Sequence, residues 1–170
     1  MESLVVLLLV CFGVASCAVC GPDRELFEKA SYCMVDSHIP WVSATTACSS
    51  MGGRLAVPNS QAEQAFLYDF AAQHFGIYSS IWIDCSKTST HGQWMHADGS
   101  PCEYTNFIYG DVDGANCVHM YLNSGYWFAV DCSANIFPVV CELPLPEGSS
   151  EEVKPSMFCM EFGADGRLHP

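Results

Sequence analysis

The sequence predicts a single α+β domain, and three observations support that class. Two segments with helical patterns lie in the first half of the chain. Short apolar runs separated by Gly, Asp, Asn and Ser fill the second half and are typical of strands joined by long loops. The 170 residues suit one domain with a hydrophobic core, and the 11 cysteines are typical of a disulfide-stabilised domain in an oxidising compartment.

Residues 1–16 are predicted to be a secretory signal peptide. The segment from Ser3 to Ala15 is almost wholly apolar and too short to span a bilayer. Small residues allow cleavage after Ser16, Cys17 or Ala18, although no Lys or Arg precedes the apolar segment. A buried N-terminal strand is the alternative. No later segment has transmembrane length, so we expect a secreted, extracellular protein without membrane insertion.

The first helix is expected directly after Pro40, over residues 41–48. Pro40 would then occupy its first turn, where a proline has no hydrogen bond to lose. Gly52 and Gly53 are expected to end it, because glycine readily adopts the conformation that terminates helices. A short strand over residues 55–57 should follow.

The second helix is expected to begin at a capping box formed by Ser60 and Glu63 and to continue to about His74. Gly76 is expected to end it. His74 is interpreted as a packed or surface residue rather than a metal ligand. Four residues have the spacing of one helical face: Phe66, Phe70, Ala71 and His74.

Charge and motifs exclude several classes of function. The formal net charge is −13, and the six Lys and Arg residues are scattered, which argues against nucleic acids, heparin-like polymers and anionic membranes as partners. No nucleophile elbow, metal-ligating His pair or phosphate-binding loop is present. We therefore expect a protein that is not an enzyme. No Asn-x-Ser/Thr sequence occurs, so N-glycosylation is not expected.

Residues 144–170 differ in composition from the rest of the chain. They begin with a Pro-rich and then acidic linker that should not pack. An apolar segment follows over residues 157–162. It is expected either to be disordered or to dock on the domain, and the sequence does not decide between the two.

From Trp41 to Glu142 the chain resembles the C-type lectin-like domain family, whose domain would span residues 20–143. The resemblance implies an α+β fold with two helices, short antiparallel sheets and long loops. It rests on an ordered series of motifs: Trp41, Cys48, Gly52-Gly53-Arg54-Leu55, Glu63, Trp82-Ile83, Asp98-Gly99-Ser100, Tyr104-Thr105-Asn106, Cys117-Val118-His119-Met120, Trp127, Cys132 and Cys141-Glu142.

Eight cysteines allow 105 pairings, and the sequence alone does not choose among them. The family resemblance implies the pairs Cys48–Cys141 and Cys117–Cys132. It also implies Cys20–Cys33, which marks the form of the domain with an extra N-terminal hairpin.

Two further cysteines, Cys85 and Cys102, stand where the family usually has other residues. A fourth bridge between them would close a loop of sixteen residues. Zinc bound by Cys85, His91, His96 and Cys102 is the alternative, although the spacing matches no common zinc motif. Secretion favours the disulfide.

Cys159 has no partner within this framework. If cleavage follows Ser16, a Cys17–Cys159 bridge is expected. That bridge would give a monomer. If cleavage follows Cys17 or Ala18, Cys159 has no partner in the chain and a dimer linked through Cys159 is expected.

The resemblance also implies where calcium and sugar would bind, and this chain departs from that pattern. Calcium needs six to eight oxygen ligands. The family supplies them from a Glu-Pro-Asn or Gln-Pro-Asp triplet, an acidic residue two before the loop cysteine and an Asn-Asp pair after a strand Trp. The matching positions here hold Asp111-Val112-Asp113, Ala115, Phe128 and Ala129. We therefore expect no cofactor; a weak calcium site at Asp111 and Asp113 is the alternative to a solvated turn.

Five residues are the candidate ligand surface: Tyr109, Asp111, Asp113, Tyr126 and Phe128. The three aromatic residues replace polar ones around the expected ligand site. They would form an apolar platform for a sugar or a protein partner, with core packing as the alternative for each. Trp127 is expected in the core, and Asp131 is expected to be a hydrogen-bonding loop residue.

The predicted function is noncatalytic recognition of a protein or glycan ligand, without calcium. Two alternatives remain: a calcium-dependent lectin with a rearranged site, and an acidic structural protein associated with matrix or mineral.

Overall fold

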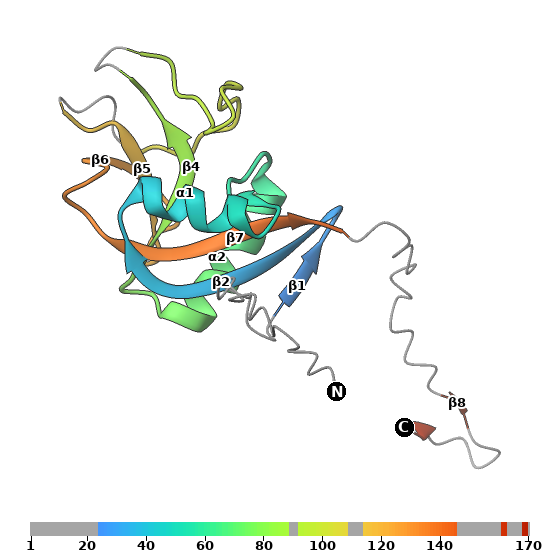
Figure 1. Cartoon of the computed structure of the whole chain (residues 1–170). Helices are drawn as coiled ribbons and strands as arrows, with labels where there is room; N and C mark the ends of the chain where they lie inside the picture. Colours follow the sequence, from blue (N-terminus) through green and yellow to red (C-terminus); the bar gives the residue numbers. More distant parts are fainter. Residues whose placement is uncertain (1–23, 89–91, 109–113, 146–160, 163–167, 170) are drawn as a thin grey trace, which may run out of the picture.

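The computed structural model describes residues 24–88, 92–108, 114–145, 161–162 and 168–169. The described residues form two helices and three antiparallel sheets (Figure 1). The α+β class and the fold expected from the sequence are confirmed. No helix among these residues is long and apolar enough to cross a membrane.

The first sheet joins the two ends of the domain. Its strands are β1 (Arg24–Phe27), β2 (Ala30–Ile39), β7 (Phe137–Pro144) and β3 (Arg54–Leu55), in the order β1-β2-β7-β3. The antiparallel β1–β2 pair is the N-terminal hairpin that the family resemblance implies. The expected strand over residues 55–57 is shorter and begins one residue earlier, because only β3 pairs with β7.

The second sheet carries the loop-bearing part of the domain. It contains β4 (Ser80–Ser86), β5 (Cys117–Tyr121) and β6 (Trp127–Val130), with β5 in the centre. A separate pair, β8 (Glu161–Phe162) and β9 (Leu168–His169), lies in the tail. The remainder of the apolar tail segment, residues 157–160, lies outside the described residues.

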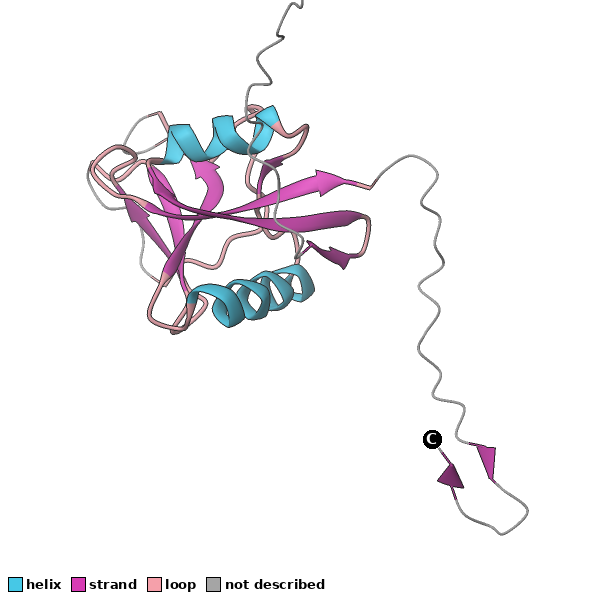
Figure 2. Cartoon of the chain, turned by 60° about the horizontal axis from the view of Figure 1, so that its bottom comes forward, coloured by secondary structure: helices cyan, strands magenta, loops and turns pink. Residues whose placement is uncertain are grey.

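The two helices lie on opposite sides of the strands (Figure 2). Helix α1 spans Trp41–Ser50, two residues longer than predicted. Pro40 is its N-cap residue rather than part of its first turn, because the backbone there is still extended, with φ −61° and ψ 156°. Gly52 ends α1 with φ of +79°, in the left-handed region that favours glycine.

Helix α2 (Gln61–Phe75) begins at Ser60, as the capping box predicts. The Ser60 hydroxyl accepts a hydrogen bond from the Glu63 N–H at 3.1 Å. The Glu63 carboxylate accepts from the Asn59 N–H at 2.8 Å rather than from that of Ser60, because it also accepts from the hydroxyl of the buried Tyr32.

The buried face of α2 differs in part from the predicted one. Phe70 and Ala71 are buried, but His74 is exposed, and its ring meets that of Phe75 at an interplanar angle of 85°. Leu67 is buried, which extends the apolar contact along the helix. Gly76 caps the helix end.

The second sheet separates two hydrophobic clusters. Val118, Met120 and Trp127 face the cluster that α2 covers. Trp82 and Cys117 face the other cluster, which contains Trp41 of α1 and Val139 of β7. Because the sheet is covered on both faces, nearly every side chain of β4 is buried.

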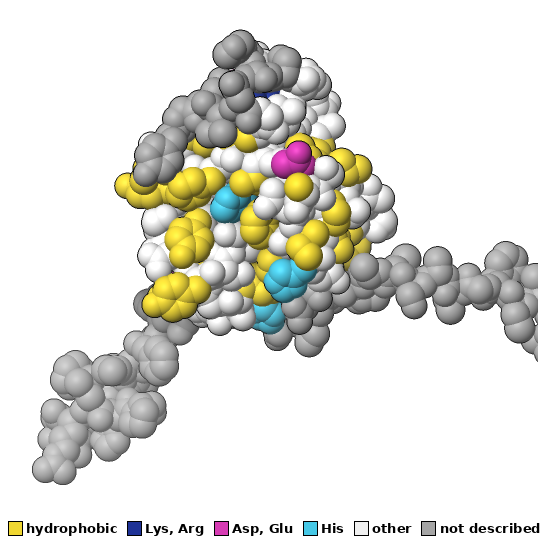
Figure 3. Space-filling view, turned by 90° about the vertical axis from the view of Figure 1, so that its left-hand side faces the viewer, with side chains coloured by type: hydrophobic (Ala, Val, Ile, Leu, Met, Phe, Trp, Pro, Cys, Tyr) yellow, Lys and Arg dark blue, Asp and Glu magenta, His cyan; other side chains and the backbone are white. Residues whose placement is uncertain are grey.

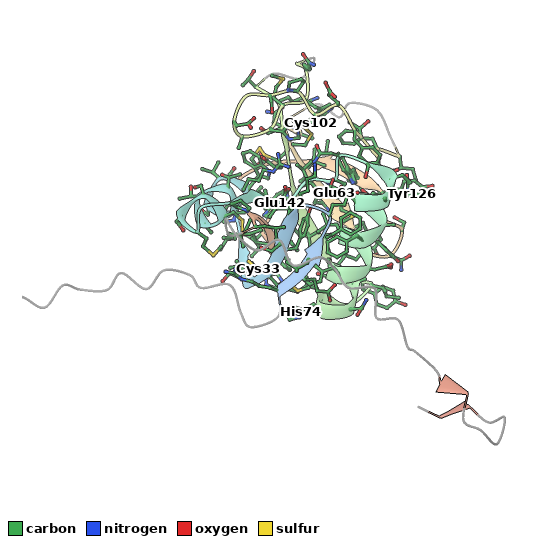
Figure 4. The ribbon with its side chains drawn as sticks, turned by 90° about the vertical axis from the view of Figure 1, so that its right-hand side faces the viewer. Cys33, Glu63, His74, Cys102, Tyr126 and Glu142 are labelled. Atoms are coloured by element: carbon green, nitrogen blue, oxygen red, sulfur yellow. A yellow bond between two sulfur atoms is a disulfide. The ribbon has the colours of Figure 1, made fainter. Side chains whose placement is uncertain are left out.

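Disulfides connect these layers at Cys48–Cys141, Cys85–Cys102 and Cys117–Cys132. Cys33 is also disulfide-bonded. Cys17, Cys20 and Cys159 lie outside the described residues, so Cys20–Cys33 and Cys17–Cys159 stay predictions. Cys102 and Cys33 lie toward opposite ends of the domain (Figure 4).

The zinc alternative is wrong, because Cys85 and Cys102 are bonded to each other and neither sulfur is available as a thiolate. His96 Nδ1 contacts the Asp84 carbonyl oxygen at 2.8 Å. His91 lies outside the described residues.

Candidate functional site

A ladder of five aromatic side chains runs from the core toward the surface of the second sheet. Its ring centroids are separated by 4.7 Å between Trp82 and Phe137, 4.6 Å between Phe137 and His119, and 5.6 Å between His119 and Phe128. Tyr121 meets the edge of Phe128 at 6.4 Å. The ladder therefore connects buried Trp82 to partly exposed rings at the sheet surface.

The strand register explains why these rings meet. In β5 and β6, Met120 lies opposite Trp127 and His119 lies opposite Phe128. Successive side chains of a strand point to opposite faces. Met120 and Trp127 thus enter the core under α2, while His119 and Phe128 project from the other face.

Tyr126 extends this surface beyond the end of the ladder. It is 41% exposed, and its carbonyl oxygen accepts a hydrogen bond from the Tyr121 N–H at 3.0 Å across the β5–β6 turn. Tyr126 lies at the edge of the molecule in Figure 4. We call His119, Tyr121, Tyr126 and Phe128 the aromatic face.

Among the described residues, the part of the molecule that carries the aromatic face has little charge. Figure 3 views the end of the domain that carries β5 and β6, and among its described side chains hydrophobic groups and histidines are prominent while carboxylates are sparse. This contrasts with the net charge of −13. The end of the domain is thus suited to apolar and stacking contacts rather than to ion pairing.

His119 is held neutral within the ladder. Its ring is stacked between Phe128 and Phe137, and its Nδ1 is buried with no hydrogen-bond partner among the described residues. Burial lowers the pKa of His119 to about 4. The ring therefore acts as an apolar aromatic group at neutral pH.

The described positions that the family uses for calcium offer no side-chain oxygen. Ala115 is 5% exposed, Phe128 is stacked on His119, and Ala129 lies in β6. Within the described part of the chain, no three His, Cys, Asp or Glu side chains are arranged to hold a metal. These positions do not fit calcium. Tyr109, Asp111 and Asp113 lie outside the described residues, so their part in the site stays a prediction.

Asp131 is a loop residue that binds its own turn. Its Oδ1 accepts from the Ser133 N–H at 2.7 Å, the Ser133 hydroxyl at 2.8 Å and the Ala134 N–H at 2.8 Å. These bonds lower the pKa of Asp131. The arrangement agrees with the predicted role in loop hydrogen bonding.

His119 and Tyr121 belong to the aromatic face but are not among the five residues predicted from the sequence to form the ligand surface. His119 stands in the sequence only as part of the family motif Cys117-Val118-His119-Met120. The alternation of side chains in the Cys117–Tyr121 segment places His119 and Tyr121 on the same face of the strand. The sequence does not indicate which of the two faces α2 covers, so it could not predict that this face lies opposite the helix.

Comparison with known proteins agrees with this architecture. The Lectin C-type domain model matches residues 37–143. The low affinity immunoglobulin epsilon Fc receptor of Mus musculus is 32% identical over 139 residues, which cover 79% of this chain and 40% of the receptor. Collectin-10 of Xenopus tropicalis is 34% identical over 124 residues, covering 70% of this chain and 43% of that protein. The chain thus spans less than half the length of these two relatives.

Solved structures show the same fold. The cow CD23 carbohydrate-recognition domain, solved in the presence of a GlcNAc2Man3 oligosaccharide, aligns with a TM-score of 0.62 at 27% identity, covering 76% of this chain and 99% of that domain. Human lithostathine aligns with a TM-score of 0.66 at 23% identity, covering 74% and 99%. The chain belongs to the C-type lectin domain family.

Proposed function

We propose that this chain is a secreted, noncatalytic recognition protein that binds a glycan or protein ligand through the aromatic face, without calcium. The observation that supports this most directly is the position of Phe128. Where the family places an oxygen ligand for calcium, this chain has a phenyl ring stacked on His119 at 5.6 Å.

The chemistry of such a surface favours apolar contact. Aromatic rings offer broad faces on which the C–H groups of a sugar or the apolar side chains of a protein can stack. Tyr121 and Tyr126 add hydroxyl groups at its exposed end, which can form hydrogen bonds to a polar ligand. The fixed ladder behind Phe128 reduces the side-chain freedom that binding would otherwise remove.

A glycan array probed with the secreted chain, in calcium and in EDTA, tests this proposal. We expect the same bound glycans under both conditions and at least a tenfold loss of affinity in Tyr126→Ala. Leu26→Ala serves as a control, since Leu26 is also exposed but lies in β1 of the other sheet. It should bind like the wild type.

Three results would contradict the proposal. Binding that EDTA abolishes would indicate a rearranged calcium site. Equal loss in Leu26→Ala would place the ligand elsewhere. No glycan or protein binding, together with salt-sensitive adsorption to mineral or matrix, would favour a structural role for the acidic chain.

A further inference from the structure

The exposed tyrosine of the aromatic face, Tyr126, stands on a turn rather than on a strand. Strand β5 ends at Tyr121 and β6 begins at Trp127, so Tyr126 is the last residue of the connecting turn. Within this turn the Gly125 N–H donates to the Tyr121 carbonyl at 2.8 Å. The place of the Tyr126 ring on the aromatic face therefore depends on what holds the turn.

The Gly125 carbonyl oxygen attaches the turn to two other parts of the domain. It accepts one hydrogen bond from Gln64 Nε2 of α2 and a second from Asn106 Nδ2, both at 2.9 Å. A carbonyl oxygen has two lone pairs, so these donors use its whole acceptor capacity. The carbonyl belongs to the planar peptide group that joins Gly125 to Tyr126. Holding its oxygen therefore fixes the backbone that enters Tyr126.

Gln64 is itself fixed within the core that α2 covers. It is 3% exposed, and its Oε1 accepts from the Trp127 indole N–H at 2.9 Å. Its Nε2 also donates to Met120 Sδ at 2.9 Å. Met120 of β5 and Trp127 of β6 lie opposite each other in the sheet. One buried amide thus connects α2 to both strands and to the turn between them.

Asn106 holds the backbone on the other side of Tyr126 as well. Its carbonyl oxygen accepts from the Trp127 N–H at 2.9 Å, while its side chain donates to Gly125. The next residue, Phe107, forms a parallel bridge with Trp127, and the two ring centroids lie 5.7 Å apart. The residues before and after Tyr126 are therefore both bound to the segment that contains Asn106.

We propose that Gln64 and Asn106 are positioning residues for ligand recognition, which fix the backbone on both sides of Tyr126 and so hold its ring on the aromatic face. This inference rests on the proposed function, in which Tyr126 contacts the ligand. Neither residue belongs to the aromatic face, and both act through the turn. A turn that is already fixed has less freedom to lose on binding, which favours affinity.

Backbone amide relaxation of the secreted chain tests the positioning without any ligand. Asn106→Ala removes one of the two donors to the Gly125 carbonyl and leaves Gln64 in place, so the domain should still fold. We expect the order parameters of Gly125 and Tyr126 to fall from about 0.85, typical of rigid backbone, toward about 0.6, typical of flexible segments.

Asn135→Ala is the matched control for this substitution. Asn135 is also half-buried, and its Nδ2 donates to a backbone carbonyl of a different loop, that of Asp131, at 3.1 Å. This variant should leave the order parameters of Gly125 and Tyr126 unchanged.

A double-mutant cycle measures whether Asn106 acts through Tyr126, with the glycan that the wild type binds most tightly on the array as the probe. Asn106→Ala should weaken binding roughly threefold or more in the wild type and should have no further effect in Tyr126→Ala. Gln64→Glu keeps an acceptor for Trp127 and removes the amide donor, so it should show the same pattern. If Gln64→Glu does not fold, the Asn106 variants decide.

Two results would overturn the proposal. The first is unchanged order parameters of Gly125 and Tyr126 in Asn106→Ala, and the second is an equal loss of binding from Asn106→Ala with and without the Tyr126 ring. If no glycan binds, or if Tyr126→Ala binds like the wild type, the proposed function fails. Lowered order parameters would still support the fixing of the turn by Asn106.

Discussion

At the scale of single residues, the environment of His119 decides its chemistry. Phe128 and Phe137 stack on its two sides, Trp82 lies across the strand pair, and burial is the cause of its lowered pKa. A charged imidazole would lose hydration in this position, and no carboxylate contacts it among the described residues. The folded state therefore favours the neutral form of the His119 imidazole.

This environment makes stability depend on pH in a defined direction. The pKa of His119 is about 4 in the fold and about 6.5 in the unfolded chain. The unfolded chain then binds a proton first as pH falls. Above pH 6.5 His119 is neutral in both states, and its titration costs the fold no stability. Between pH 6.5 and pH 4 the unfolded chain gains a proton that the fold does not, and the free energy of unfolding falls by up to about 3 kcal/mol.

Urea unfolding at several pH values checks this by comparing wild type with His119→Phe. Burial raises the pKa values of carboxyl groups such as those of Asp84 and Glu142, so these groups also make stability depend on pH. Their effect is the same in both proteins and cancels when the unfolding free energy of the variant is subtracted from that of the wild type. The wild type should lose stability relative to the variant as pH falls. Exposed His38 provides the control substitution, His38→Phe. A pH-independent difference for His119→Phe would contradict the prediction.

At the scale of elements, the start of α2 depends on one hydroxyl. Ser60 accepts from the Glu63 N–H at 3.1 Å, which satisfies a donor that the first helical turn leaves open. The Glu63 carboxylate in turn accepts hydrogen bonds from the Asn59 N–H and the Tyr32 hydroxyl, so the cap also connects α2 to β2.

Replacing this hydroxyl should destabilise the domain. Ser60→Ala should lower the free energy of unfolding by about 1 kcal/mol, as measured by the urea midpoint. Ser50→Ala is the matched control, because Ser50 is exposed and its hydroxyl donates only within α1, to the Ala47 carbonyl. Alanine suits a helix well, so this change should be neutral or slightly stabilising. Equal losses in both variants would show that the cap contributes nothing specific.

At the scale of the whole molecule, the disulfides close loops of very different length. Cys48–Cys141 connects α1 to β7 across 93 positions, whereas Cys85–Cys102 spans 17 and Cys117–Cys132 spans 15. In the chain-entropy model a longer closed loop restricts the unfolded chain more strongly. The bridge between the ends of the domain should therefore contribute the most stability.

Paired Cys→Ala substitutions measure this order in urea. Removing Cys48–Cys141 should cost between about 4 and 5 kcal/mol, and removing either short-range bridge about 3 kcal/mol. The two short-range variants serve as controls for each other, since their loops are nearly equal. A larger loss from Cys85–Cys102 than from Cys48–Cys141 would contradict the loop-length order.

The sequence by itself determined the two helices and most of their ends, whereas among the strands it gave bounds only for residues 55–57. The Pro40 and Gly52 signals enclose α1, and Ser60 and Gly76 enclose α2, because backbone conformation and capping are local effects. The family pattern implied the two bridges Cys48–Cys141 and Cys117–Cys132, which the structure contains. Loss of side-chain oxygen at Ala115, Phe128 and Ala129 was likewise visible in the residue types alone.

The tertiary structure decided which of those residues act together. Strand register brings His119 of β5 against Phe128 of β6, and packing of the chain brings Phe137 against the same ring. It also buries Asp84 beside α1, although the two are far apart in sequence. The physical reason is that stacking, burial and pKa depend on neighbours distant in the chain, whereas periodicity and capping depend on residues only a few positions away.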